Sequence, residues 1–365
     1  MATPPSQVTG GHVNITATVT DGVGVDTVKV NITYPDSSTV NVTMNEGSYY
    51  YDVIYADIGI YDYFIWTNDT SENENTSDTY QFEITASVIS FGSEYVFNFA
   101  ATDYTSVSVL NSTHFVVAYK DEGGSDYGIC RIGVMSGDTI SYGSEYVFHS
   151  AVTDYTSVSA LNSTHFVVVY EDFDSGNGTA IIGTVSGSTI LYGSEYVFDD
   201  DGTATMISVS FFDSARFVVS WSDDAENGVA IVGSVSGSTI TFGSPATFNL
   251  GRTDFTSVSA LDSTHCVIGY TDFLPSEYGV CKIGTRSGDS ISYGSAYTFN
   301  SASSGHISVS SLDATHFAVS YNDANANGGS RIGVVSGSTI TYGPENVFNP
   351  DSSGYTSVSS FNSTH

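Results

Sequence analysis

Short apolar and polar runs alternate along this chain in an order that repeats about every 50 residues. In the first complete unit, residues 105–110 and 115–119 are β-branched and aromatic runs separated by a tight polar turn. After a longer acidic loop, the runs 129–135 and 139–148 follow, with a Gly-containing turn between them. Four such runs without helical periodicity predict four antiparallel strands, which is the blade of a β-propeller.

Two short motifs mark the repeat. The first is Tyr/Phe-Gly-Ser, which begins at Phe91, Tyr142, Tyr192, Phe242 and Tyr293 and has a sixth copy, Tyr342-Gly343-Pro344. The second is Asn/Asp-Ser/Ala-Thr-His, which ends at His114, His165, His265, His316 and His365, with Arg216 in the one gap. A string of β-sandwiches is the alternative, but a sandwich domain of about 100 residues would not show this period.

The period predicts five complete blades, at residues 105–148, 156–198, 206–248, 256–299 and 307–348. We expect one strand before them (88–97) and one after them (355–361) to share an incomplete sixth blade. The ring should then be open or imperfectly sealed and leave an unpaired edge. Because the sixth unit stops midway, we expect this sequence to be a segment of a longer protein.

The N-terminal part lacks the repeat markers. After a linker of residues 1–8, residues 9–86 carry six strand-like runs that predict an immunoglobulin-like β-sandwich, followed by the propeller repeats of residues 87–365. The runs VNITATVTDGVGVDTVKVNITYP and YDYFIWTNDTSENENTSDTYQF resemble the immunoglobulin-like modules of archaeal cell-surface and secreted proteins. That resemblance covers this domain only and implies a spacer or adhesive module. The propeller units resemble repeat arrays of microbial surface proteins.

The chain is strongly acidic, with 40 Asp and Glu residues against 8 Lys and Arg and a net charge of −32. Such a surface repels nucleic acid and anionic membranes, so we expect neither as a partner. The Ser/Thr/Tyr/Gly-rich composition favours an extracellular β protein. Residues 1–10 hold neither a basic nor an apolar stretch, and no run of 18 apolar residues is present, so we expect any export signal or anchor to lie outside this sequence.

The three cysteines, Cys130, Cys266 and Cys281, fall in strand positions. We interpret them as buried free thiols, with a Cys266–Cys281 bridge as the alternative. Export would make the Asn-x-Ser/Thr motifs candidate glycosylation sites. These motifs stand at Asn14, Asn31, Asn41, Asn68, Asn75, Asn111, Asn162, Asn177 and Asn362.

The repeated histidines occur once per blade at the same turn. A propeller spreads such positions around its rim, so neighbouring copies should be too far apart to share a metal ion. We therefore predict that they and the neighbouring threonines bond to the turn backbone.

An acidic loop follows the second strand of each blade and begins with Asp121, Asp172, Asp223, Asp272 or Asp323. The last of these loops, Asp323-x-Asn325-x-Asn327-Gly, matches the start of calcium loops, in which alternate oxygen ligands surround the ion. It resembles the calcium loops of integrin-type propellers, although the distal Glu of an EF-hand is absent. Asp172, Asp174 and Asn177 form a looser version. Ordinary hairpin turns are the alternative.

Catalytic motifs are missing from the sequence. No G-x-S-x-G, H-E-x-x-H, Walker loop or G-x-G-x-x-G is present. The expected innermost strands read TSVSVL, TSVSAL, MISVSF, TSVSAL and HISVSS, and they offer Ser where a propeller glycosidase presents Asp or Glu. We therefore expect no enzyme.

Strand order places the Asn-Ser-Thr-His and Ser-Gly turns at one end of every blade, here named the turn face. The acidic loops and the connections between blades lie at the other end, the loop face. Loop-face sequences vary, and binding residues concentrate on loops that a rigid scaffold presents, so we predict that a ligand contacts this face. The aromatic candidates are Tyr127, Phe173, Phe273 and Tyr278. The alternative is that these loops vary because nothing constrains them.

Together these features predict a non-enzymatic extracellular surface protein that acts in adhesion or ligand binding. One alternative is a carbohydrate-binding propeller or the accessory part of a secreted polysaccharide-degrading enzyme. Another is a structural subunit of a surface layer. The sequence leaves open whether the partner is a cell-surface protein, a glycan or a further copy of the chain.

Overall fold

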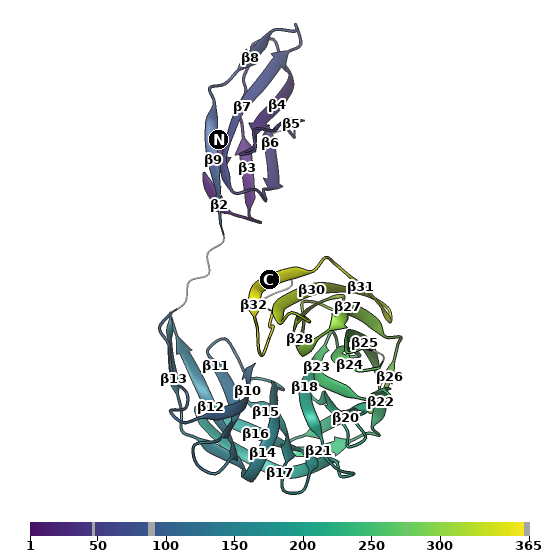
Figure 1. Cartoon of the computed structure of the whole chain (residues 1–365). Helices are drawn as coiled ribbons and strands as arrows, with labels where there is room; N and C mark the ends of the chain where they lie inside the picture. The colour runs from purple at the N-terminus through teal and green to yellow at the C-terminus, as the bar shows by residue number, and fades with distance from the viewer. Residues whose placement is uncertain (46–47, 87–91, 275, 361–365) are drawn as a thin grey trace. The chain divides into compact units, whose positions relative to one another are not determined.

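The computed structural model describes residues 1–45, 48–86, 92–274 and 276–360. These residues form strands and connecting segments, with no helix among them. These described residues therefore contain no helix that is long and apolar enough to cross a membrane. The chain divides into two compact units, Met1–Phe91 and Gly92–His365 (Figure 1).

The N-terminal unit consists of two sheets around one core. One sheet has the order β1 (Ala2–Thr3), β3 (His12–Thr16), β6 (Tyr50–Ile54). The other has the order β2 (Ser6–Val8), β9 (Tyr80–Thr85), β7 (Gly59–Asp69), β4 (Val25–Thr33), β5 (Thr39–Thr43), with β8 (Glu74–Thr76) paired to β7. Alternate residues of facing strands, such as Ile15 of β3 and Val30 of β4, are fully buried in the shared core. The relationship to immunoglobulin-like modules stays a prediction.

Residues 1–8 differ from the predicted linker. They contain β1 and β2, which pair with β3 and with β9 respectively. β2 runs parallel to β9, with Ser6 opposite Glu83 and Val8 opposite Thr85. Runs of two and three residues are too short for alternation to be visible in a sequence, so only the pairing partners reveal them as strands.

The second unit is a β-propeller with the five predicted blades (Figure 1). Blade 1 contains β10 (Thr102–Val109), β11 (His114–Asp121), β12 (Tyr127–Ser136), β13 (Thr139–Tyr142) and the start of β14 (Tyr146–Ala160). Blade 2 contains the rest of β14, β15 (His165–Asp172), β16 (Asn177–Ser186) and β17 (Thr189–Asp199). Blade 3 contains β18 (Thr205–Asp213), β19 (Arg216–Ser222), β20 (Gly228–Ser236), β21 (Thr239–Phe242) and β22 (Ala246–Asn249).

Blades 4 and 5 repeat the plan of blade 3, in which the fourth strand is split in two. Blade 4 contains β23 (Thr253–Ala260), β24 (His265–Asp272), β25 (Tyr278–Ser287), β26 (Ser290–Tyr293) and β27 (Tyr297–Ser303). Blade 5 contains β28 (Gly305–Ser311), β29 (His316–Asn322), β30 (Asn327–Ser336), β31 (Thr339–Tyr342) and β32 (Asn346–Ser352). All pairings within the blades are antiparallel.

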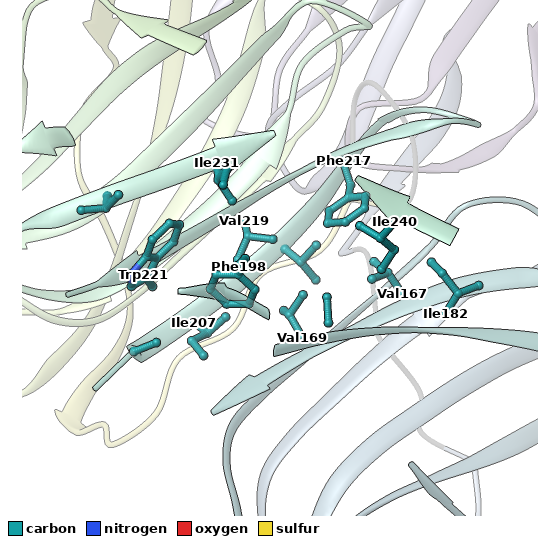
Figure 2. Packing of buried hydrophobic residues seen from close by; sticks show 14 of the residues in the cluster. Val167, Val169, Ile182, Phe198, Ile207, Phe217, Val219, Trp221, Ile231 and Ile240 are labelled. Carbon is teal, nitrogen blue, oxygen red and sulfur yellow. The ribbon is translucent and has the colours of Figure 1, made fainter. Parts of the chain in front are cut away.

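The second strand of each blade is apolar on both sides because a neighbouring blade covers each side. In β15, Val167 and Val169 pack in a cluster with Val219 and Trp221 of blade 3, as Figure 2 shows. Phe166, on the opposite side of the same strand, belongs to the cluster that blade 2 shares with blade 1. A continuous apolar run in the second strand therefore indicates that a blade packs on each side of it.

Glycine is required at one position of the third strand. A Cβ on Gly183 would lie 2.2 Å from the ring of Phe166, which packs across this backbone from β15. The equivalent glycines of blades 1, 3 and 5 face a phenylalanine ring at the same distance. The glycine thus makes room for the phenylalanine ring of the neighbouring strand.

Serines of the innermost strand connect each blade to the next. Ser106 and Ser108 of blade 1 accept hydrogen bonds from the backbone N–H groups of Val158 and Ala160 of blade 2, at 3.1 and 2.9 Å. The same contacts recur at later junctions, from Ser157, Ser208, Ser210, Ser257 and Ser259. The Ser-x-Ser motif is therefore a structural link between blades.

The ring is open between blade 5 and blade 1 (Figure 1). Of the predicted strand 88–97, residues 88–91 lie outside the described residues and 92–97 form no strand. Residues 355–360 have no strand pairing either, and residue 361 is not described. Val107 of β10 is 62% exposed, as expected for an uncovered edge.

All three cysteines are free and fully buried, so the interpretation as free thiols is confirmed. Burial raises the pKa of each thiol to about 12. These thiols are therefore unreactive at neutral pH.

Candidate functional site

One residue per blade, at the start of the innermost strand, lines a cavity of about 330 Å³ where the strands converge on the loop face. Each precedes the Thr/Ile-Ser-Val-Ser motif, and the six together are here named the mouth ring. Its members are Tyr104, Tyr155, Met206, Phe255, His306 and Tyr355. The cavity is otherwise lined by the Thr or Ile that follows each of them in the later blades.

The backbone at these positions is strained. The first five residues of the mouth ring have φ between 48° and 53°, which is left-handed and unusual for large side chains. The register of the first strand pair shifts at the same place, for example between Asp154 and Ser157, which marks a β-bulge. Such strain costs on the order of 1–3 kcal/mol per residue and is concentrated at functional sites.

Aromatic rings lie against one another around the cavity. The ring centroids of Tyr104 and Tyr155 are 4.9 Å apart, and those of Phe255 and His306 are 4.6 Å apart. His306 also contacts Tyr355, which is 92% exposed, at 4.4 Å. Burial lowers the pKa of His306 below its usual 6.5, so the imidazole is neutral at pH 7. The site therefore offers flat, uncharged, polarisable surfaces.

Charged groups surround the tyrosine side of the mouth ring. Lys120 Nζ lies 2.8 Å from Asp154 Oδ1, and Asp154 is paired across the sheet with Glu171. Glu171 is only 3% exposed, and its pKa is raised to about 7, first by burial and then by the charges of Asp154 and Asp172. Burial raises the pKa of Tyr155 most, and the charge of Glu171 raises it further. Two carboxyl groups and one ammonium group therefore lie beside the tyrosines of the mouth ring.

The four aromatic residues predicted from the loops lie elsewhere on the loop face, on three blades. Tyr127 and Tyr278 are partly buried and pack against blade cores. Phe273 lies 3.9 Å below the guanidinium of Arg252, and Phe173 is 57% exposed. None of the four lines the mouth cavity. Their role in binding stays a prediction.

The sequence prediction did not include the mouth ring, because the Ser-Val-Ser motif of the innermost strands is constant between units and the residue at their start is not. The residue two positions before that motif is Tyr, Tyr, Met, Phe, His or Tyr, so a large side chain recurs at every unit. That recurrence was visible in the sequence. Its convergence on one cavity and its left-handed backbone were not.

The proposed calcium loop at Asp323 has the geometry of a hydrogen-bonded turn. The backbone N–H groups of Asn325 and Asn327 donate to Asp323 Oδ1 at 2.8 and 2.9 Å. The Asn327 side-chain amide donates to Asp323 Oδ2 at 3.1 Å. The carboxylate oxygens already accept hydrogen bonds, and calcium binding here stays a prediction.

In the second candidate loop, Asp172 Oδ2 accepts a hydrogen bond from Ser175 at 2.7 Å. Its Oδ1 lies 3.3 Å from His149 Nε2, and the backbone N–H of Asn177 bonds to Ser175 rather than to Asp174. Among the described residues, no three His, Cys, Asp or Glu side chains cluster as a metal site. The loop is instead tied to the connection between blades through His149.

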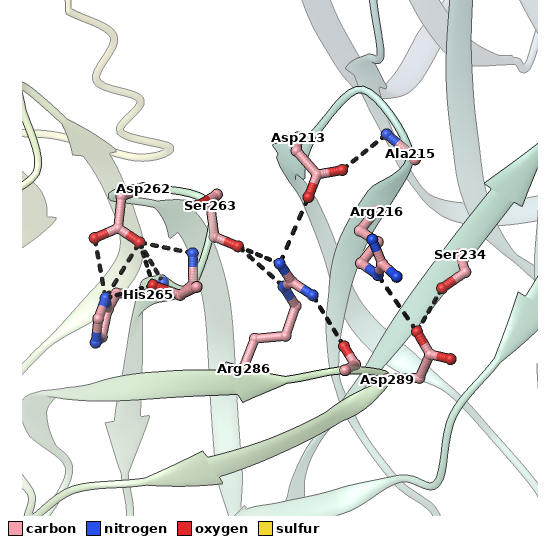
Figure 3. Close-up of polar contacts among 11 residues, drawn as sticks. Asp213, Ala215, Arg216, Ser234, Asp262, Ser263, His265, Arg286 and Asp289 are labelled. Atoms are coloured by element: carbon pink, nitrogen blue, oxygen red, sulfur yellow. Dashed lines mark hydrogen bonds and ion pairs between the residues drawn. The ribbon is translucent and has the colours of Figure 1, made fainter.

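The repeated histidines lie in hydrogen-bonded turns. Asp262 accepts hydrogen bonds from the backbone N–H groups of Thr264 and His265, and the His265 ring lies 3.0 Å from its second oxygen (Figure 3). Burial alone would raise the pKa of Asp262, but these bonds outweigh it and lower the pKa to about 2. Asn111 and Asn162 organise the same turn in blades 1 and 2.

Arg216, which replaces the histidine of blade 3, has a different contact. Its Nε lies 3.5 Å from Asp289 of blade 4, and Arg286 of blade 4 lies 3.5 Å from Asp213 of blade 3 (Figure 3). Two ion pairs therefore link these blades across the turn face, in place of the local histidine contact.

The candidate glycosylation sites differ in exposure, and their modification stays a prediction. Asn362 lies outside the described residues. Asn14, Asn31, Asn68 and Asn177 are partly buried, and Asn68 accepts a hydrogen bond from the backbone of Thr27. The exposed acceptors are Asn41, Asn75, Asn111 and Asn162.

Comparison with known proteins identifies the fold. No family model matches the sequence. No curated protein matches it either. AofleA from Arthrobotrys oligospora superposes with a TM-score of 0.50 at 9% identity, over 80% of this chain and 83% of that one.

Two further structures are similar to this one. SapL1 lectin in complex with alpha methyl fucoside matches with a TM-score of 0.46 at 14% identity, over 79% of this chain and 93% of the lectin. NanB sialidase from Streptococcus pneumoniae matches with a TM-score of 0.42 at 14% identity, over 55% of this chain but only 33% of the sialidase. The strand order of the chain itself defines an all-β protein with a propeller fold, and the superposition on AofleA agrees with this fold.

Proposed function

We propose that this protein is a non-enzymatic propeller that binds carbohydrate at the mouth ring. The observation that carries the proposal is the convergence of large, mainly aromatic side chains on one cavity of the loop face. Ligand sites are typically apolar and aromatic with a few polar groups that fix orientation. Here the tyrosine hydroxyls and the threonines Thr156, Thr256 and Thr356 supply the polar groups for sugar hydroxyls.

The lining of the cavity supports the proposal of binding without catalysis. Most glycoside hydrolases place two carboxylates on either side of the bond they cleave. None of the residues that line this cavity is Asp or Glu. Incubation with oligosaccharides that the protein binds should therefore release no shorter products, and their release would contradict this part of the proposal.

The electrostatics select the class of sugar. The net charge is −32, and Asp154 and Glu171 lie beside the tyrosines of the mouth ring. A negative field weakens the binding of acidic sugars such as sialic acid. The ligands we propose are neutral or amino sugars at the end of a glycan.

The biological setting we propose is the outside of a cell, with the propeller adhering to glycans and the N-terminal unit as an immunoglobulin-like spacer. The acidic, Lys-poor composition and the exposed Asn-x-Ser/Thr acceptors support this setting. Localisation of a tagged full-length protein in its own host tests it, and a cytoplasmic signal would contradict it.

The central test is a glycan array followed by calorimetry with the best ligand. Tyr155→Ala and Phe255→Ala remove rings that blades 2 and 4 contribute to the mouth ring, and each should weaken binding at least about tenfold. Leu191→Ala is the matched control, because Leu191 is 67% exposed on the fourth strand of blade 2. Phe173→Ala and Phe273→Ala test the loop residues and should leave binding unchanged. Loss of binding only in the loop variants would move the site to the loops, and a parent protein that binds no glycan would overturn the proposal.

A further inference from the structure

The four complete junctions between blades bury the same residue of the innermost strand. The N–H of this valine donates a hydrogen bond to a serine of the preceding blade, and its side chain is 5–7% exposed in blades 2 to 5. The four residues are Val158, Val209, Val258 and Val309. A covered valine whose N–H donates to a serine therefore indicates a blade on the preceding side.

Blade 1 carries the same strand without this cover. Val107 is 62% exposed and Val109 is 69% exposed, and neither N–H donates to a serine in the described residues. On the side that faces the opening, the innermost strand of blade 1 is thus uncovered, whereas the Phe97 ring covers Tyr119 of the second strand, with ring centroids 5.2 Å apart.

Blade 5 is uncovered on the opposite side. Phe348 is 58% exposed, whereas the equivalent phenylalanines of blades 1 to 4 are 2–7% exposed. Ile332 is 41% exposed, whereas its four equivalents are fully buried or nearly so. The opening therefore lies between two partly uncovered blade surfaces, one on blade 5 and one on blade 1, and each is of the kind that packs against a neighbouring blade elsewhere in the propeller.

Part of the junction on the blade 5 side is already formed. The backbone N–H groups of Val358 and Ser360 donate to the side-chain oxygens of Ser308 and Ser310, each at 3.2 Å, and the Thr356 hydroxyl donates to the His306 carbonyl. Residues 355–360 therefore occupy the place of an innermost strand. Their own Ser357 and Ser359 stand at the positions from which every other blade links to the next.

We infer that the opening is the seat of a sixth blade, with residues 355–360 as its innermost strand and further strands of this repeat between them and Phe97, which already packs on Tyr119. The two sides of the opening define this occupant. Burying Phe348 on one side and Val107 on the other requires a sheet that is apolar on both faces, as β15 is in blade 2. In the complete ring, the N–H groups of Val107 and Val109 donate to the side-chain oxygens of Ser357 and Ser359. This inference does not depend on the proposed function.

The test measures the exposure of residue 107 by thiol labelling. Because the three native cysteines are fully buried, a single Val107→Cys substitution provides the one accessible thiol. The control is Leu191→Cys, which is exposed to a similar degree on a blade away from the opening. Labelling is compared in the chain alone, with an excess of a peptide of residues 313–354, and in a chain extended after residue 365 by a copy of residues 317–354.

The expected result is rapid labelling of both thiols in the chain alone. In the extended chain, Val107→Cys should react at least about tenfold more slowly and Leu191→Cys at an unchanged rate, and the separate peptide should give the same protection at saturation. Undiminished labelling of Val107→Cys in the extended chain would overturn the inference. Protection in the chain alone that grows with protein concentration would also overturn it, because the occupant would then be a second copy.

Discussion

The turn face and the loop face of the propeller are built from the same strands but differ in what varies between blades. On the turn face, Asn or Asp accepts hydrogen bonds from its own turn in blades 1, 2, 4 and 5, and blade 3 deviates through Arg216. On the loop face, the mouth ring changes from Tyr to Met, Phe and His while its backbone stays nearly constant, with φ of 48° to 53°. On the turn face, the same side chains recur because they stabilise the turn. On the loop face, the backbone conformation recurs while the side chains differ between blades.

This difference indicates where function lies. A constant side chain in a repeat is explained by a local contact, such as Asp262 with His265. A constant strained backbone with varied large side chains has no such local explanation, because Gly would satisfy the backbone at lower cost. The large side chains at these positions are therefore the ones to which the proposed function assigns binding.

The largest effect is expected in the strands that lead to the turn face. Gly183→Val places side-chain atoms where a Cβ is already 2.2 Å from the Phe166 ring, so we expect a loss of roughly 3 kcal/mol in the free energy of unfolding. Urea denaturation measures it. Gly354→Val is the control, since nothing lies within 4 Å of its Cβ position, and it should match the parent. Equal stability of the two variants would contradict the packing described here.

The next effect separates strain from binding at the mouth ring. Tyr155→Gly removes the ring and also removes the strain of a left-handed backbone at a non-glycine residue. The lost strain, about 1 kcal/mol, offsets the packing that is lost with the ring. We expect stability within about 1 kcal/mol of the parent but glycan affinity reduced at least about tenfold. Tyr155→Phe keeps the ring and should retain most of the affinity. A Gly variant that binds like the parent would show that this ring has no binding role.

The third prediction concerns pH. The folded-state pKa of Glu171 is about 7 against 4.5 in the unfolded chain, so its contribution to stability is complete below pH 4.5 and is lost as pH rises through 7. Glu171→Gln should remove this loss, which is on the order of 3 kcal/mol at most. Chemical denaturation at pH 5 and pH 8 measures it, with Glu122→Gln as an exposed control. A parent and a variant with parallel pH profiles would contradict the raised pKa.

The smallest effect is expected from calcium. Because Asp323 already accepts N–H hydrogen bonds, we expect the melting temperature in millimolar calcium and in chelator to differ by no more than about 1 °C. Scanning calorimetry of the parent and of Asp323→Ala measures it. A larger rise in the parent that Asp323→Ala abolishes would instead establish a calcium site at Asp323, Asn325 and Asn327.

Much of the fold could be predicted from the sequence because the same pattern of strands occurs five times in it. The blade limits, the buried cysteines and the open side all follow from the period and from apolar runs such as Phe166–Tyr170. The edge strands β1 and β2 could not be predicted, since pairing alone distinguishes them from a linker. The mouth ring could not be located either, because its members lie about 50 residues apart and meet only when the blades close around an axis.

The serine links have a mechanical consequence. Each joins only adjacent blades, so tension applied to the two ends of the propeller would detach the terminal blades first and leave the inner ones intact. Each step would release a segment of about 50 residues, which extends to roughly 170 Å. A single molecule stretched between two surfaces should therefore give a sawtooth of evenly spaced force peaks, and the propeller would lengthen in steps under load instead of breaking its attachment at once.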